Sequence, residues 1–162
     1  MVADPDQALT ALVEERGQWL VRCAYLLTHD RELALDLTQD TLVQAWRAWE
    51  KVSAAEHPDR YLLRVMLNLH RSHYRRRRLP VVPLDGLELP APDAVGRVDE
   101  YDAISTALGR LTERQRAVIV LRYWADYDDQ VIAEVVGCRR TTVRSLAARG
   151  LAVLRTHLEE KP

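Results

Sequence analysis

The chain has 162 residues, a formal net charge of −1 and 48% hydrophobic residues. This length allows one domain or two small ones, and the apolar content is sufficient for a packed core. No apolar run approaches the ~20 residues that a membrane-spanning helix needs, and early acidic residues argue against a signal peptide. The two cysteines lie within apolar helical patterns and indicate no disulfide framework. We therefore expect a cytoplasmic protein without membrane insertion.

The small net charge conceals strongly charged segments. From Asp30 to Glu50 acids outnumber bases five to two, from Arg60 to Arg78 there are seven arginines, and from Arg139 to Arg155 there are five arginines and no acid. Such segregation is expected if an acidic face meets a protein and basic faces meet nucleic acid.

The first half of the chain has helical periodicity throughout. Leu9 to about Leu27 predicts one helix, and Thr28 is a candidate N-cap for the next. That second helix has small and apolar residues spaced along one face, and Leu33, Asp36 and Asp40 on another. The residues expected to pack inward are Ala34, Leu37, Thr41, Ala45 and Ala48.

A third helix is predicted from Arg60 to Arg78, opened by Pro58 or Asp59. Its polar face carries several arginines, and Tyr61 and Tyr74 are interleaved with them, which favours base stacking and phosphate contacts over a merely solvated face. His70 and His73 lack a third ligand at a usable spacing, so we expect no metal site.

A proline- and glycine-rich stretch without periodicity divides the chain. The sequence thus predicts an all-α protein of two small helical domains, residues 8–78 and 99–160, joined by a flexible linker, residues 79–98. In the second domain Thr112 and Gln115 predict a capping box at the start of a helix from Glu113 to Trp124.

The segment from Asp128 to Arg155 predicts a helix-turn-helix. Asp128 is a suitable N-cap, Ala133 is small where the helices touch, and Gly137 tolerates a positive φ at the turn. Arginines and short polar side chains lie on the outer face of the second helix, which suits a DNA major groove. An αα-hairpin with a solvated basic face is the alternative to a DNA-binding unit.

With these features in order, the sequence resembles the extracytoplasmic-function (ECF) sigma factors of the sigma-70 family, most closely the actinobacterial SigE-type members. The resemblance to region 2 of the family lies in the segments LTHDRELALDLTQDTLVQAW and PDRYLLRVMLNLHRSHYRRRR. The resemblance to region 4 lies in LTERQRAVIVLRYWADYDDQVIAEVVGCRRTTVRSLAARGLAVLR. The resemblance implies a non-catalytic subunit, without a cofactor, that binds core RNA polymerase and promoter DNA and helps melt the −10 element. It also implies a compact two-domain form as an inactive state, with an anti-sigma factor as a candidate partner.

The resemblance also assigns site residues to three surfaces. The surface for the β′ clamp of core polymerase comprises Leu33, Asp36, Leu37, Gln39 and Asp40. The −10 surface comprises Arg64, Asn68, Arg71, Arg75 and Arg76, with Asn68 expected to hold a flipped base. The −35 surface comprises Arg139, Arg140, Thr142, Arg144, Ser145 and Arg149. Arg122 is a weaker candidate for a DNA-backbone or β-flap contact.

The sequence departs from the family pattern at two positions. Leu35 replaces a usual glutamate, and Arg139 stands at the recognition-helix N-cap where the pattern has serine. One alternative is a dimeric helix-turn-helix regulator that acts without core polymerase. Such a regulator would require a dimerisation surface and would have no use for an acidic docking face, and neither condition fits this sequence. Another is a sigma-like interaction protein that has lost promoter activity, and Leu35 and Arg139 are its only support.

Overall fold

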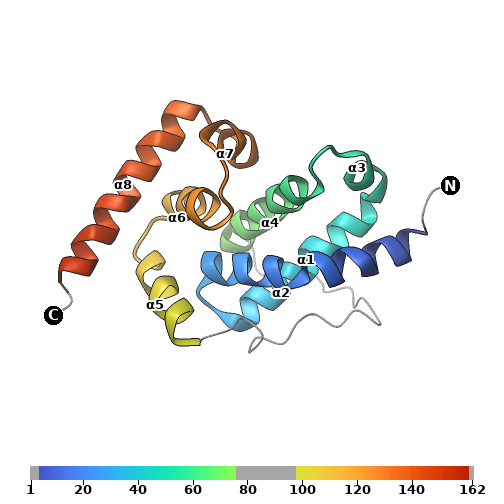
Figure 1. The fold of residues 1–162 in the computed structure, drawn as a ribbon, viewed down its shortest axis with the longest axis horizontal. Helices are drawn as coiled ribbons and strands as arrows, with labels where there is room; N and C mark the ends of the chain where they lie inside the picture. The colour runs from blue at the N-terminus through green and yellow to red at the C-terminus, as the bar shows by residue number, and fades with distance from the viewer. Residues whose placement is uncertain (1–3, 76–97, 161–162) are drawn as a thin grey trace.

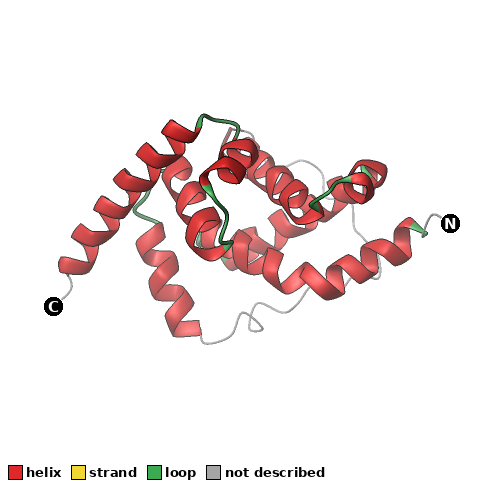
Figure 2. Cartoon of the chain, turned by 45° about the horizontal axis from the view of Figure 1, so that its top comes forward, coloured by secondary structure: helices red, strands yellow, loops and turns green. Residues whose placement is uncertain are grey.

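The computed structural model describes residues 4–75 and 98–160. This part of the chain contains helices and no strand, which confirms the all-α prediction (Figures 1 and 2). None of its helices is long and apolar enough to cross a membrane. The helices are α1 (Pro5–Thr28), α2 (Arg31–Arg47), α3 (Trp49–Ala54), α4 (Pro58–Arg75), α5 (Val98–Leu108), α6 (Glu113–Ile119), the π-helical turn η2 (Val120–Trp124), α7 (Asp129–Val136) and α8 (Arg140–Glu159).

The first domain is built from α1, α2 and α4, with α2 packed against both of the others. Leu20, Leu42, Leu62 and Met66 are fully buried between these helices. The face of α2 that was predicted to pack inward is buried at Ala34, Leu37, Thr41 and Ala45, whereas Ala48 is half-buried. Helical spacing of small and apolar side chains therefore identified the core face of α2 correctly.

The start of α2 differs from the prediction by two residues. The N-cap is Asp30, whose carboxylate accepts a hydrogen bond of 3.0 Å from the backbone N–H of Leu33. Thr28 is instead the last residue of α1, and its hydroxyl donates to the carbonyl of Ala24. His29, in the left-handed region at φ 55°, separates the two helices. The prediction of Thr28 as the cap was wrong because Asp30 provides the side-chain acceptor for the first turn of α2.

The second domain contains the predicted capping box, but the helix that it starts is not uniform. The Thr112 hydroxyl accepts from the N–H of Gln115, and the Gln115 side chain accepts from the N–H of Thr112. The α-helical pattern ends at Ile119 and continues as η2, in which the N–H of Ala125 bonds to the carbonyl of Val120. The predicted single helix to Trp124 is therefore divided in two.

The two domains pack against each other in this structure (Figure 1). Trp19 of α1 stacks on Trp124 of η2, with ring centroids 5.3 Å apart. The buried guanidinium of Arg116 crosses the junction, donating to the carbonyls of Leu27 at 2.8 Å and Leu108 at 2.9 Å. One continuous apolar core therefore joins residues of both domains.

Candidate nucleic-acid interface

The helix-turn-helix forms as the sequence predicts, from α7, a turn at Gly137, and α8. Asp128 caps α7 by accepting a 2.9 Å hydrogen bond from the N–H of Val131. Gly137 ends α7 in the left-handed region at φ 75°, where a side chain would be strained. Ile132 and Val143 are fully buried where the two helices cross. The crossing therefore fixes the outward face of α8 relative to the rest of the domain.

The −35 candidates lie on that outward face or at its edge. Five of the six side chains are exposed and that of Thr142 is half-buried. Ala147 is buried and Leu146 is half-buried, so these two apolar residues contribute to packing rather than to the exposed face. The exposed candidates are Arg139, Arg140, Arg144, Ser145 and Arg149.

The recognition helix α8 begins without a side-chain cap. Arg139 occupies the N-cap position with extended backbone angles, but its side chain accepts no hydrogen bond there. An arginine side chain has only donors, so it cannot satisfy the exposed N–H groups at a helix start. The structure thus confirms that serine's replacement by Arg139 leaves this helix poorly capped.

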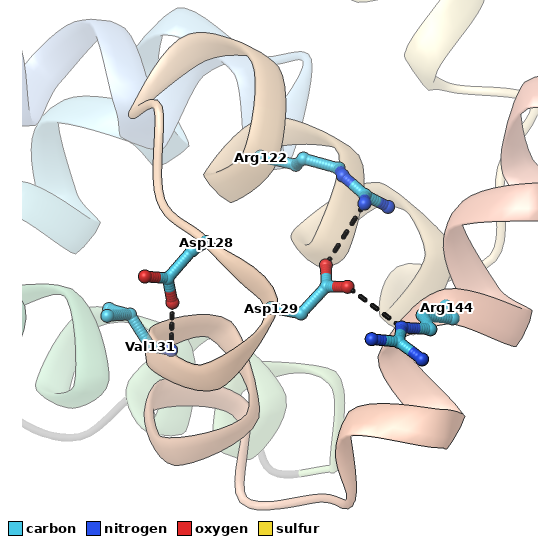
Figure 3. Close-up of polar contacts among 5 residues, drawn as sticks. All are labelled: Arg122, Asp128, Asp129, Val131 and Arg144. Atoms are coloured by element: carbon cyan, nitrogen blue, oxygen red, sulfur yellow. Dashed lines mark hydrogen bonds and ion pairs between the residues drawn. The ribbon is translucent and has the colours of Figure 1, made fainter.

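Asp129 is a neighbour of the recognition helix that was not anticipated from the sequence. Its carboxylate forms ion pairs with Arg122 at 3.1 Å and with Arg144 at 3.2 Å (Figure 3). The sequence shows three charged residues on three separate elements, and only the folded crossing brings them together. Arg122, a candidate for a DNA-backbone or β-flap contact, therefore already has a carboxylate partner.

Two of the −10 candidates on α4, Arg64 and Arg71, lie against the end of α7. Arg64 and Asn68 are exposed, and Arg71 is half-buried. Arg64 Nη2 donates to the carbonyl of Glu134 at 2.7 Å, and Arg71 Nη2 donates to the carbonyl of Val136 at 3.1 Å. The side chain of Arg75 and the whole of Arg76 lie outside the described residues. In this arrangement, two predicted DNA contacts are hydrogen-bonded to the other domain.

The docking candidates on α2 separate into surface and core positions. Leu33 is 49% exposed, and Asp36, Gln39 and Asp40 are half-buried. Leu37 is only 2% exposed and packs in the core of the first domain. Its assignment to the contact surface needs correction, because its position on α2 makes it a supporting residue beneath that surface.

A tyrosine links the helix-turn-helix to the start of α4. The Tyr127 hydroxyl donates to Asp59 Oδ2 at 2.6 Å, and the Arg60 guanidinium lies 5.7 Å from the centroid of the Tyr127 ring. Burial, reinforced by the hydrogen bond to Asp59, raises the pKa of Tyr127 above its usual value of 10.0. Tyr127 therefore stays protonated at neutral pH and acts as a hydrogen-bond donor between the domains.

Comparisons with known proteins agree with the two-part organisation. A sequence model of sigma-70 region 2 matches residues 12–79, and one of sigma-70 region 4 matches residues 101–154. The chain is 35% identical over 147 residues to an RNA polymerase sigma-E factor of Streptomyces coelicolor, covering 90% of this chain and 83% of the relative. It is 31% identical over 158 residues to the ECF RNA polymerase sigma factor SigL of Mycobacterium tuberculosis, covering 94% and 89%.

Solved structures show the same fold. The sigma factor RpoE of Bartonella quintana, in complex with the anti-sigma factor NepR, superposes with a TM-score of 0.70 at 22% identity, covering 99% of this chain and all of that one. CnrH, in complex with the cytosolic domain of CnrY, superposes with a TM-score of 0.67 at 26% identity, covering 98% of this chain and all of that one.

Fold and sequence together define a protein of the sigma-70 family, whose members are non-catalytic transcription initiation factors. Within that family the chain belongs to the ECF sigma factors. It is a promoter-recognition subunit of RNA polymerase, and the alternative of a dimeric regulator acting without polymerase is not supported.

Proposed function

We propose that the three surfaces divide the work of promoter recognition as follows. The exposed face of α2 binds the β′ clamp of core polymerase in the cytoplasm, α4 binds the −10 element, and α8 enters the major groove of the −35 element. The observation that carries the −35 assignment is the basic outward face of α8, supported from below by the buried crossing with α7.

The charges of the surfaces favour this division. Leu33 adds an exposed apolar side chain to the carboxylates of Asp36 and Asp40 on α2, a combination that suits a basic helical partner. Arg64 and Arg71 supply fork-shaped donors for phosphates, and Asn68 lies between them on α4. We also propose an anti-sigma factor as a regulatory partner, because the structural neighbour RpoE was solved with one.

Charge reversal at Asp40 tests the docking surface. Asp40→Arg should weaken core-polymerase binding by about a hundredfold or more, because like charges juxtaposed across an interface cost several kcal/mol. Binding is measured by fluorescence anisotropy with purified core enzyme, and urea unfolding verifies that the variant is folded.

Glu14→Arg is the matched control, since it makes the same charge change at an exposed position of α1. Leu33→Arg, at a more exposed position of α2, should also weaken binding with little effect on folding, because it too places a positive charge against a basic partner. Affinity that remains unchanged in folded Asp40→Arg would remove this residue from the interface.

A further inference from the structure

Two adjacent aspartates at the start of α7 have different structural roles (Figure 3). Asp128 is exposed and caps α7 through the N–H of Val131. The Asp129 side chain is 14% exposed and lies between Arg122 of η2 and Arg144 of α8. Asp129 is therefore placed to act on the recognition helix, whereas Asp128 acts on its own helix.

The contact with Arg144 uses one particular edge of the guanidinium. Arg144 donates from Nε to Asp129 Oδ2 at 3.2 Å, while its side chain is 61% exposed. An arginine reads guanine by presenting two parallel N–H donors to O6 and N7. Because the hydrogen bond to Asp129 uses Nε, the two terminal Nη groups can still present parallel donors to a guanine. The same bond limits the orientations of the guanidinium plane.

The same contact changes the charge of the DNA-facing surface. The segment from Arg139 to Arg155 contains five arginines and no acid, so a carboxylate must come from another element. Asp129 supplies one beside Arg144. Positive charge on such a face attracts phosphates of any sequence, and a nearby carboxylate opposes that attraction.

We propose that Asp129 is a positioning residue for −35 recognition, orienting Arg144 toward a base and lowering sequence-independent attraction to phosphates. This inference rests on the proposed function of α8. An aspartate in the first turn of a helix ordinarily stabilises that helix through its charge. The proposal gives Asp129 a second effect, on the specificity of DNA recognition.

The test uses holoenzyme reconstituted from core polymerase and the full chain, with a promoter library randomised at the −35 element. Asp129→Asn should flatten the base preference by about tenfold at the same position that Arg144→Ala flattens, which is the scale of one bidentate base contact. The double variant should lose no further preference there. Binding of the free chain to scrambled duplex DNA should become tighter in Asp129→Asn.

Asp128→Asn is the matched control, because it removes the same charge from the adjacent residue and asparagine caps as well as aspartate. It should leave the base preference unchanged. Asp129→Glu, which keeps the carboxylate, should restore much of the preference and guards against a folding defect in Asp129→Asn.

The outcomes separate the inference from the function on which it rests. If the wild-type holoenzyme selects a −35 sequence and Asp129→Asn selects the same one as strongly, the inference is overturned and the function stands. If the wild-type holoenzyme selects no −35 sequence, the proposed function of α8 fails and the inference fails with it.

Discussion

At the residue scale, the helix starts of the second domain differ in how well they are capped. Thr112 and Asp128 both accept hydrogen bonds from backbone N–H groups, whereas Arg139 accepts none. The uncapped start belongs to α8, the helix proposed to enter DNA. An arginine at that position cannot cap the helix, but it places a positive charge on the surface that is proposed to face DNA phosphates.

Arg139→Ser should therefore change stability and DNA binding in opposite directions. Serine can accept from the first turn of α8, and a good cap contributes about 1 kcal/mol, so the free energy of unfolding should rise by that amount. Affinity for duplex DNA should fall if Arg139 contacts a phosphate. Urea unfolding and anisotropy with duplex DNA measure the two effects.

Asp128→Ala provides the opposite case, because it removes an existing cap and should lower the free energy of unfolding by about 1 kcal/mol. Equal stability of wild-type protein and Arg139→Ser would contradict the role of capping at α8.

At the scale of elements, α6 and α8 approach closely at Gly150. A Cβ atom added to this buried glycine would lie 3.1 Å from Cγ1 of Ile119, closer than ordinary van der Waals contact. Gly150 therefore sets how closely the recognition helix packs on the domain core. Its role was not anticipated, because a glycine within a helical pattern does not reveal which helix lies opposite.

Gly150→Leu should lower the free energy of unfolding by about 1–3 kcal/mol, the usual cost of overpacking a filled core. Ala152→Leu is the matched control, since Ala152 is exposed on the same helix and its substitution should change stability by less than about 0.5 kcal/mol. Urea unfolding compares the two, and equal effects would mean that α6 does not restrict α8 at Gly150.

Features with local causes were predictable from the sequence. The cap at Asp128, the capping box at Thr112 and the positive φ at Gly137 depend on residues within one turn of each other. The prediction of Thr28 as the cap was wrong because threonine and aspartate can both cap, and only the completed end of α1 shows that Thr28 belongs to that helix. The π-helical turn at Val120 left no signal in the apolar periodicity.

Contacts between distant segments were not predictable in this way. Arg64 and Arg71 bond to backbone carbonyls of α7, and a carbonyl is present at every residue whatever its side chain. The position of Asp129 between Arg122 and Arg144 likewise depends on how three elements cross. The sequence identified which arginines face outward, but not what they contact.

At the scale of the whole molecule, the packing of the domains determines which surfaces are available. Arg64 and Arg71 donate to the end of α7, so these donors cannot hold DNA until α7 moves away. The domains pack together here, and the sequence resemblance predicts that a compact form is inactive. We therefore expect that DNA binding through α4 requires the helix-turn-helix to separate from it.

Tyr127→Phe should favour that separation. It removes the hydrogen bond to Asp59, and a hydrogen bond to a charged group contributes about 1.5–3 kcal/mol. The ratio of the separated to the compact form should therefore rise by about tenfold or more. Binding of single-stranded DNA to the free chain, measured by anisotropy, should tighten accordingly. Tyr123→Phe, at a position 60% exposed, is the control and should have no effect.

The raised pKa of Tyr127 gives the same contact a pH dependence. The folded state holds the phenol proton of Tyr127 more tightly than the unfolded chain does. The contribution of this proton to the free energy of unfolding is therefore complete below pH 10 and is lost as the pH rises further. Urea unfolding above pH 10 should show a steeper loss of stability in the wild type than in Tyr127→Phe. Parallel losses would show that Tyr127 does not contribute.

Transcription in vitro tests the central claim most directly, using purified bacterial core polymerase, this protein and a fragment library of the source genome. We predict specific transcripts that depend on the added protein, with two shared sequence elements upstream of their starts. Core binding without any transcript would contradict promoter activity and indicate a sigma-like interaction protein. Footprints on symmetric DNA sites without core binding would contradict the sigma-factor account altogether.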